Sequence, residues 1–280
     1  MIELSPELQT RFNGPDTFDR ILALDGQTFR AFANRRTLRF ENGDKGYFLK
    51  IHEGVGWSEI LKNLLYFRLP VVGSRDEWLA LRRLRELGVP TMNIAGFGER
   101  GWNPARRESF LITEELRNRV SLEDFCHPWL LNPPPPALKR ALVARVAAVA
   151  RTLHTHGVNH RDFYLCHFLL DPSTVTYPCL PERLRLEVID LHRAQLRART
   201  PRRWIVKDIA GLYFSAMDIG LTRRDLYRFM QVYRRAKLRD TLVQDRAFWS
   251  DVTRKATRLY LRIFKRPPAA GWPHQGILER

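Results

Sequence analysis

The chain of 280 residues has little cysteine, no long apolar run and no acidic excess. Its three cysteines, Cys126, Cys166 and Cys179, cannot all pair and lack the spacing of metal ligands, which indicates free thiols in a reducing compartment. The most apolar stretch, residues 141–150, contains Arg145 and is shorter than the ~20 residues that a membrane-spanning helix requires. The N-terminus carries acids where a signal peptide needs basic and then apolar residues. We therefore expect a protein that is neither exported nor embedded in a membrane.

Positive charge is abundant, with a net charge of +17 and a pI near 10.5. It is concentrated in residues 193–266, which contain 20 Lys and Arg but only 6 Asp and Glu. Such a surface attracts polyanions: nucleic acid, an anionic bilayer, a phosphorylated glycolipid or an acidic protein. Nucleic acid is disfavoured, because the sequence has no helix-turn-helix signature, zinc-finger spacing or RNP-type aromatic strand. A solvated face without a partner is the other alternative.

The pattern of apolar residues divides the chain into two parts. Strand signals separated by turn residues predict an antiparallel sheet, at residues 28–33, 37–40 and 47–51. After residue 133 the pattern becomes helical, with Leu138, Leu142 and Val146 four residues apart, until Gly157 ends the helix. We therefore predict an α+β fold with a small antiparallel-sheet lobe, residues 1–115, and a mainly helical lobe, residues 116–280.

Two aspartates beside apolar runs indicate phosphoryl transfer. His160-Arg161-Asp162 matches the H-R-D motif of kinases, and Asp190 ends the apolar run that begins at residue 186. In kinase-like enzymes the first aspartate accepts the proton of the attacking hydroxyl, and the second holds Mg²⁺ against the phosphates of ATP. Either motif alone would be weak evidence for a kinase. The test is whether a strand lysine and a helix glutamate precede the H-R-D motif in the chain.

The preceding sequence supplies those parts in the required order. Lys50 lies in a short strand and can pair with the α and β phosphates, and Glu77 lies in a predicted helix that can present it to Lys50. The strand at residues 109–116 then enters a candidate adenine-binding hinge at Glu114. The order predicts a protein-kinase-like two-lobed fold with ATP in the cleft between the lobes.

Several of these features also have simpler interpretations. Ser74 and Glu77 fit a capping box, in which Glu77 would bond the Ser74 amide. Residues 96–101 match G-x-G-x-x-G but neither open a helix nor precede the strand lysine, so we interpret them as a turn between strands. We place the phosphate-covering loop at residues 34–36 instead. A zinc cluster near His160 is disfavoured, since no H-E-x-x-H motif is present.

Four segments closely resemble the lipopolysaccharide core heptose(I) kinase family of Gram-negative bacteria, and the likeness continues along nearly the whole chain. They are residues 45–52, 56–65, 158–170 and 188–195. The resemblance implies a protein-kinase-like fold and ATP-dependent phosphorylation of the first heptose of the inner core at its 4-hydroxyl. It also implies a cytoplasmic enzyme that is peripheral on the cytoplasmic face of the inner membrane.

The resemblance also implies a role for each candidate residue. Asp162 resembles the catalytic base and Asp190 the Mg²⁺ ligand. The ATP-binding residues would be the phosphate lysine with its helix partner and two backbone contacts to adenine, namely Lys50, Glu77, Glu114 and Leu116.

Two departures from the wider kinase pattern concern the metal. His167 stands where H-R-D-x-x-x-x-N has a metal-binding asparagine, and D-F-G is replaced by Asp190-Leu191-His192. Imidazole is a poor ligand for Mg²⁺, so either His167 contacts phosphate or the second metal is weak or absent. The heptose kinase family shares both departures, which leaves the number of metals open.

The basic lobe then has candidate partners. A lipid A core glycolipid carries phosphates and acidic sugars, which arginines such as Arg202 and Arg203 would hold at an anionic membrane surface. Arg254 and Arg258 belong to a predicted helix with a basic outer stripe. The apolar segment 57–68 either grazes the bilayer or packs on the small lobe. The family resemblance also raises acyl carrier protein as a possible partner.

Two alternative functions stay open at this stage. One is a kinase of the same fold that acts on another sugar or small-molecule hydroxyl. The other is a non-catalytic module that binds glycolipid or membrane. The second is disfavoured, because a binding module has no need for Lys50, Glu77, Asp162 and Asp190 together.

Overall fold

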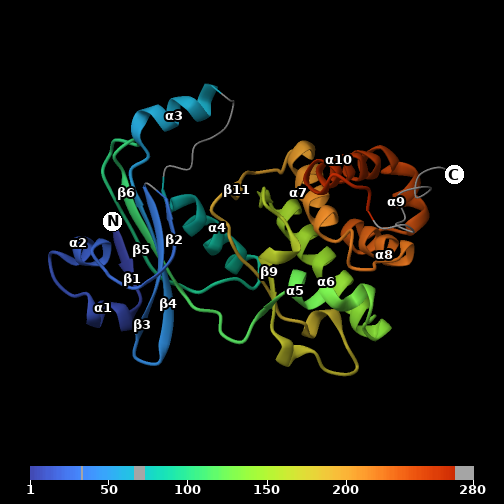
Figure 1. Cartoon of the computed structure of the whole chain (residues 1–280), viewed down its shortest axis with the longest axis horizontal. Coiled ribbons are helices and arrows are strands. Elements are labelled where there is room, and N and C mark those ends of the chain that lie inside the picture. Colours follow the sequence, from blue (N-terminus) through green and yellow to red (C-terminus); the bar gives the residue numbers. More distant parts are fainter. Residues whose placement is uncertain (33, 66–72, 269–280) are drawn as a thin grey trace. The chain divides into compact units, whose positions relative to one another are not determined.

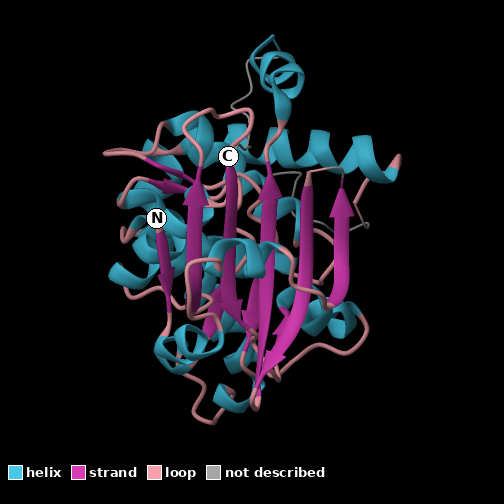
Figure 2. Ribbon diagram, turned by 90° about the vertical axis from the view of Figure 1, so that its left-hand side faces the viewer, coloured by secondary structure: helices cyan, strands magenta, loops and turns pink. Residues whose placement is uncertain are grey.

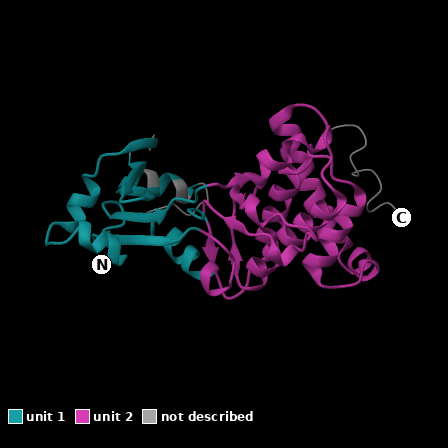
Figure 3. Ribbon diagram, turned by 90° about the horizontal axis from the view of Figure 1, so that it is seen from below, with its two compact units in different colours: residues 1–83, 92–117, 191–193 teal, residues 84–91, 118–190, 194–280 magenta. Residues whose placement is uncertain are grey.

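The structure is a computed structural model that describes residues 1–268, except residue 33 and residues 66–72. The chain forms two compact units, which are coloured separately in Figure 3. Unit 1 contains residues 1–83, 92–117 and 191–193, and unit 2 contains residues 84–91, 118–190 and 194–280. Neither unit is a continuous stretch of sequence.

Unit 1 is built on a six-stranded antiparallel sheet with the strand order β1-β5-β6-β4-β3-β2 (Figures 1 and 2). The strands are β1 (Ile2–Leu4), β2 (Gln27–Phe32), β3 (Arg35–Asn42), β4 (Lys45–Glu53), β5 (Ile94–Arg100) and β6 (Glu108–Glu114). The helices are α1 (Pro6–Arg11), α2 (Thr17–Leu22), α3 (Gly56–Leu65) and α4 (Arg75–Glu86), whose last turn belongs to unit 2.

The core of unit 1 follows from the two-residue period of its strands. Tyr47, Leu49 and Ile51 of β4 are buried in one cluster with Leu8 of α1 and Phe18 of α2. Successive side chains of a strand point to opposite faces, so the intervening residues of β4 face away from α1 and α2. The period therefore places the even-numbered side chains of β4 on the face that α4 covers.

The predicted strands are confirmed within β2, β3 and β4, whereas the predicted turn at residues 34–36 is confirmed only at Asn34. The role of this turn as the phosphate-covering loop stays a prediction. Asn34 lies in the turn, whereas Arg35 and Arg36 belong to β3 and pair with His52 and Ile51 of β4. Residue 33 lies outside the described residues. Full pairing with β4 adds Arg35 and Arg36 to the start of the predicted strand.

The glycines at residues 96–101 serve packing inside the sheet. Gly96 and Gly98 lie within β5, where an added Cβ would come within 2.7 Å of the Leu4 side chain and 2.3 Å of the Phe110 ring, respectively. Only Gly101, with φ of 92°, lies beyond the strand. The predicted turn is wrong for the first two glycines, which allow neighbouring side chains to approach the β5 backbone.

Unit 2 is mainly helical. Its α-helices are α5 (Leu122–Cys126), α6 (Pro136–Thr155), α7 (Arg202–Ser215), α8 (Arg223–Arg234), α9 (Leu238–Gln244) and α10 (Arg246–Phe264). Short strands form a three-stranded and a two-stranded sheet: β7 (Val120–Ser121), β8 (Val158–Asn159), β9 (Phe168–Leu170), β10 (Leu186–Val188) and β11 (Gln195–Leu196). Single 3₁₀ turns are η1 (His127–Leu130), η2 (Leu165–His167), η3 (Pro172–Thr174) and η4 (Pro181–Arg183).

Helix α6 confirms the apolar spacing found in the sequence. Leu138, Leu142 and Val146 are all buried, and Gly157 follows the helix with φ of 78°. Residues three and four apart share one face of a helix, which here faces the core of unit 2. Within the described part of the chain, no helix is both long and apolar enough to cross a membrane.

Candidate active site

Lys50 and Glu77, which the sequence predicts as a pair, form an ion pair in unit 1. Lys50 Nζ lies 2.6 Å from Glu77 Oε1, and the Glu77 side chain is only 1% exposed. The second carboxylate oxygen of Glu77, Oε2, has no hydrogen-bond partner among the described residues. A buried carboxylate held in this way depends strongly on its cation, because loss of the cation leaves an uncompensated charge.

Two contacts fix helix α4, which carries Glu77. The N–H of Ser74 donates to Ser109 Oγ over 2.9 Å, and the Trp78 ring stacks on Phe97 with centroids 4.4 Å apart. Glu77 lies between these anchors in the chain and is therefore held over the sheet. The capping-box interpretation is wrong, because the Ser74 amide bonds Ser109 and the Glu77 carboxylate bonds the lysine of β4.

His52 lies two residues after Lys50 on β4 and was not identified from the sequence. It is 6% exposed, and its Nδ1 has no hydrogen-bond partner among the described residues. Burial, followed by the nearby charges of Arg35, Lys50 and His192, lowers the pKa of His52 to about 3. The ring is therefore neutral at physiological pH.

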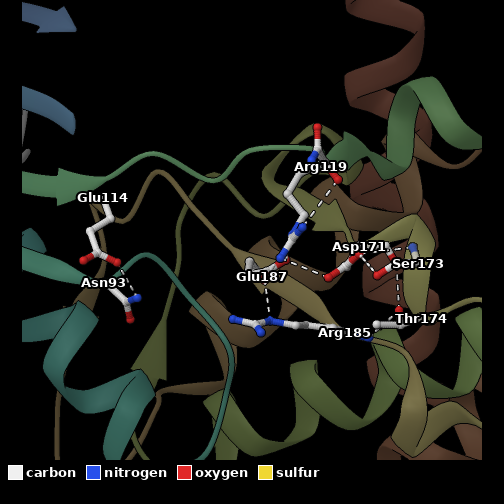
Figure 4. A network of polar contacts seen from close by, with 9 residues as sticks. Asn93, Glu114, Arg119, Asp171, Ser173, Thr174, Arg185 and Glu187 are labelled. Carbon is white, nitrogen blue, oxygen red and sulfur yellow. Dashed lines mark hydrogen bonds and ion pairs between the residues drawn. The ribbon is translucent and has the colours of Figure 1, made fainter. Parts of the chain in front are cut away.

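The candidate hinge begins where β6 ends at Glu114. The Glu114 N–H donates to Asn93 O over 2.9 Å, and Glu114 Oε2 accepts from Asn93 Nδ2 over 2.7 Å (Figure 4). Glu115 accepts from Nε and Nη2 of Arg39 at 2.8 and 2.9 Å, which lowers the pKa of Glu115. Both acidic side chains therefore fasten the end of β6 within unit 1. The adenine contacts of Glu114 and Leu116 stay predictions.

In unit 2, a buried aspartate of α7 holds the H-R-D segment. Asp208 is 1% exposed and accepts from the backbone N–H groups of His160 and Arg161 at 2.7 and 2.8 Å. Arg161 has φ of 74°, a left-handed conformation that a non-glycine residue adopts at a cost. The two charge-assisted bonds offset that cost and fix the backbone that leads into Asp162.

Asp208 was not identified from the sequence, although a signal was present. It is an acidic residue within the apolar run of α7, between Val206 and Ile209, both of which are buried. A carboxylate at a buried position needs a partner, so this pattern could have marked it as a functional or structural anchor.

Two histidines connect the segments that carry Asp162 and Asp190. His167 Nδ1 donates to the carbonyl of Asp162 over 2.6 Å, and His167 Nε2 lies 3.4 Å from Asp190 Oδ2. The His160 and His167 rings stack with centroids 5.6 Å apart, and His160 Nε2 donates to Ile189 O over 2.9 Å. Burial lowers the pKa of His160, which keeps that ring neutral. Asp162 and Asp190 are thus linked through side chains of one unit.

Asp190 is suited to hold Mg²⁺ together with phosphate oxygens. Its side chain is 32% exposed and its φ is 60°, so it leaves the β10 direction and presents an accessible carboxylate. Mg²⁺ binds oxygen ligands and commonly uses one or two carboxylates plus substrate phosphates. The described residues contain no group of three or more His, Cys, Asp or Glu that could hold a metal unaided. This donor set fits a metal that arrives with a nucleotide.

A second polar network braces strand β10, which precedes Asp190. Glu187, fully buried, accepts from Arg119 Nε at 3.2 Å and lies 2.6 Å from Arg185 Nε. Arg119 Nη2 also lies 3.0 Å from Asp171 (Figure 4). The network joins the segment before β7 to β10 and was not identified from the sequence, because its members are far apart in the chain.

Comparison with known proteins yields one family and close relatives. The sequence profile of the lipopolysaccharide kinase (Kdo/WaaP) family matches residues 19–233. The lipopolysaccharide core heptose(I) kinase WaaP of Escherichia coli is 50% identical over 266 residues, which cover 95% of this chain and 99% of that protein. The protein of the same name from Pseudomonas aeruginosa is 53% identical over 251 residues, covering 90% of this chain and 92% of that protein.

A solved structure is also similar. It is described as WaaP in complex with acyl carrier protein, and it shares 46% sequence identity and a TM-score of 0.79 with this chain. The match covers 93% of this chain and 99% of that chain.

Proposed function

The chain belongs to the lipopolysaccharide kinase (Kdo/WaaP) family, and we propose from this premise that it phosphorylates the first heptose of the lipopolysaccharide inner core. The phosphoryl donor is ATP and the acceptor is the 4-hydroxyl of that heptose. The family resemblance and the protein-kinase-like α+β fold predicted from the sequence are both confirmed. The observation that carries the proposal is the set of Lys50, Glu77, Asp162 and Asp190 in a chain about half identical to heptose kinases.

We assign nucleotide binding to the predicted lobe of residues 1–115, most of which lies in unit 1, although residues 84–91 belong to unit 2. Lys50 neutralises the α and β phosphates, and Glu77 orients its ammonium group at 2.6 Å. The backbone of Glu114 and Leu116 contacts adenine. Support for this assignment comes from the end of β6, where the Glu114 and Glu115 side chains are held by Asn93 and Arg39.

We assign the chemical step to the predicted lobe of residues 116–280, most of which lies in unit 2, although residues 116–117 and 191–193 belong to unit 1. Asp162 accepts the proton of the heptose 4-hydroxyl while the hydroxyl oxygen attacks the γ-phosphorus of ATP. The bond between the γ-phosphorus and the bridging oxygen of the β-phosphate breaks, and ADP leaves. Asp208 acts as a positioning residue, because it holds the backbone of His160 and Arg161 and not the substrate. Phosphoryl transfer depends on positioning, which explains a rigid support for one carboxylate.

Asp190 holds the metal in this proposal and His167 lies beside it. Bound Mg²⁺ neutralises charge on the β and γ phosphates. His167 donates through Nδ1 to the Asp162 carbonyl, so its Nε2 is directed toward Asp190. There it lies beside the carboxylate and contacts phosphate. We assign one metal to Asp190, because imidazole is a poor Mg²⁺ ligand.

The partners follow from charge and from one exposed helix face. Residues 193–266 carry 20 Lys and Arg against 6 Asp and Glu, which suits an anionic inner-membrane surface and an acidic acyl carrier protein. On α3, Trp57, Leu61 and Leu65 are 54, 55 and 79% exposed at spacings of four residues. This stripe supports peripheral contact with the cytoplasmic face of the membrane. The rest of the predicted segment, residues 66–68, lies outside the described residues.

The test is transfer of labelled γ-phosphate from ATP to core glycolipid that lacks the heptose phosphate, with Mg²⁺. We expect label on the heptose with the wild-type protein, and at least about a 10²-fold loss of turnover with Asp162→Ala, since a general base contributes about 10²–10⁴-fold. ATP binding, measured by calorimetry, should be retained. Arg140→Ala, on the exposed side of α6, is the control for an unrelated surface change.

The outcomes separate the alternatives. Unchanged turnover of Asp162→Ala would remove this aspartate as the base. If the wild-type protein binds ATP but leaves the glycolipid unlabelled, the result would favour a different sugar or small-molecule hydroxyl as acceptor, a missing protein partner or a non-catalytic module. Failure to bind ATP at all would favour a non-catalytic module.

A further inference from the structure

A basic hollow lies between α7 and α10 of unit 2. It encloses about 270 Å³ and is open to solvent. Helix α10 packs beside α7 (Figure 1). The hollow is lined by five cationic residues, one acid and one apolar residue: Arg202, Arg203, Arg254, Lys255, Arg258, Asp251 and Val206. Since water occupies about 30 Å³ per molecule, the hollow has room for a group several times larger than one water.

The positive charge of the basic hollow exceeds the negative charge of its own lining. Asp251 is the single carboxylate in its lining, and it pairs with Arg202 at 2.6 Å and with Arg254. No ion pair is found for Lys255 or Arg258 within the described part of the chain. The first turn of α7 contains no acidic residue either. Clustered cations repel one another, so a multivalent anion is the ligand that this lining favours.

The basic hollow is linked to the H-R-D segment through one indole ring. The guanidinium of Arg203, in the lining, lies 5.5 Å from the Trp204 ring centroid. The guanidinium of Arg161, directly before Asp162, lies 5.1 Å from the same centroid. All three residues belong to unit 2, so the distance between the hollow and the candidate base is set within one compact unit. A ligand group held in the hollow would be fixed relative to Asp162.

We propose that the basic hollow binds a phosphate group of the glycolipid acceptor, on a sugar other than the heptose that reacts. This inference rests on the proposed function. Four of the five cations are arginines, whose planar donors match phosphate oxygens in pairs. The lining has no aromatic residue on which a nucleic acid base could stack.

Binding is the first test and requires no turnover. The probe is phosphatidylcholine vesicles that contain core glycolipid, prepared without the heptose phosphate, with its remaining phosphates either intact or removed by a phosphatase. Full-length protein is assayed by flotation with Arg203→Gln/Arg258→Gln. The matched control is Arg140→Gln/Arg239→Gln, which removes two exposed arginines from α6 and α9, outside the hollow.

We expect the hollow variant to bind the phosphorylated vesicles about 10-fold more weakly, in line with the loss of two charge-assisted contacts. Binding to dephosphorylated vesicles should be equally weak for all three proteins. Arg203→Lys/Arg258→Lys should regain part of the affinity, and Asp251→Asn should bind more tightly, because it adds net positive charge. Equal binding of wild-type and hollow-variant protein to the phosphorylated vesicles would overturn the proposal.

Kinetics separate this inference from the proposed function. A contact away from the reacting hydroxyl changes ground-state and transition-state binding alike, so KM for glycolipid should rise about 10-fold with kcat unchanged. An unchanged KM would refute the inference while leaving heptose phosphorylation intact. Loss of acyl carrier protein binding, with glycolipid binding intact, would instead make the hollow a protein-docking site. Absence of transfer by the wild-type protein would refute the function and leave the flotation test standing.

Discussion

In unit 1 the candidate residues Lys50 and Glu77 come from a regular strand and a regular helix, whereas in unit 2 Asp162 and Asp190 come from irregular backbone. The strand and the helix position the first pair by their own periods, with one ion pair of 2.6 Å between them. The second pair depends on left-handed residues, with φ of 74° at Arg161 and 60° at Asp190. Such backbone persists only when surrounding groups hold it.

The supporting groups differ accordingly. Glu77 keeps an unpartnered oxygen, so its unit relies on a buried charge pair. The backbone of the H-R-D segment is instead held by hydrogen bonds with Asp208 and His167. The His160 ring of the same segment donates to the carbonyl of Ile189. We therefore expect a substitution at the Lys50–Glu77 pair to act mainly through charge, and one near the H-R-D segment to act through the position of the backbone.

The largest effect should follow from Asp208→Ala. It leaves the buried N–H groups of His160 and Arg161 without an acceptor, and charged hydrogen bonds contribute about 1.5–3 kcal/mol each. We expect the free energy of unfolding to fall by about 3–6 kcal/mol and kcat to fall at least about 10²-fold, as the backbone before Asp162 shifts. Urea denaturation and steady-state kinetics measure the two effects.

Asp225→Ala is the matched control for Asp208. Asp225 is also a buried aspartate of unit 2, but it forms the capping box of α8 with Thr222. Its loss should cost about 1–2 kcal/mol of stability without a change in kcat. If both variants lost the same fraction of kcat, Asp208 would have no specific effect on the H-R-D segment.

The next effect concerns the charge pair of unit 1. Lys50→Met leaves the buried Glu77 carboxylate uncompensated, and we expect the free energy of unfolding to fall by about 3 kcal/mol. The double variant Lys50→Met/Glu77→Met should recover to within about 1 kcal/mol of wild type, because apolar groups replace both charges. A double-mutant cycle by urea denaturation checks this. Additive losses would show that the two side chains do not depend on each other.

The smallest effect is a pH dependence in unit 1. The pKa of His52 is about 3 when folded, well below its ordinary 6.5, so the unfolded chain binds a proton first as the pH falls. The contribution of His52 is complete above pH 6.5 and declines below it, by about 2 kcal/mol at pH 5. His52→Phe should show less acid destabilisation than wild type, measured as urea midpoints at pH 7 and pH 5.

A histidine of unit 2 controls for this last prediction. His156 is exposed directly after the end of α6, and His156→Phe is the matched variant that replaces an exposed imidazole. Should His52→Phe and wild type lose equal stability between the two pH values, burial of His52 would not be the source of acid sensitivity in unit 1.

The features that could be predicted from the sequence are those that follow a local motif or a regular spacing of apolar residues. The H-R-D motif and the aspartate after residues 186–189 marked Asp162 and Asp190, and apolar spacing marked α6 and the strands β2 to β4. The sequence also predicted the pairing of Lys50 with Glu77, because both motifs have a fixed order in kinases. Their functional roles stay predictions.

The rest could not be predicted, because it depends on partners distant in the chain. Asp208 accepts hydrogen bonds from Arg161 and His160, which precede it by 47 and 48 positions in the chain. Arg119 bonds Glu187, which is 68 positions away. Such pairs leave no local spacing to detect. Strand β1 has only three residues, which are too few to show a two-residue period. The glycines of β5 match a loop motif in the sequence, and only the close approach of Phe110 to Gly98 in the structure shows that they belong to a strand.

The discontinuity of unit 1 has a consequence for synthesis on the ribosome. Residues 191–193 belong to unit 1, yet residues 118–190 of unit 2 precede them in the chain. A nascent chain grows from its N-terminus at about 5–20 residues per second, so unit 1 lacks its last stretch until much of unit 2 has emerged. The late stretch directly follows Asp190, so unit 1 is completed just after the residue assigned to the metal has been made.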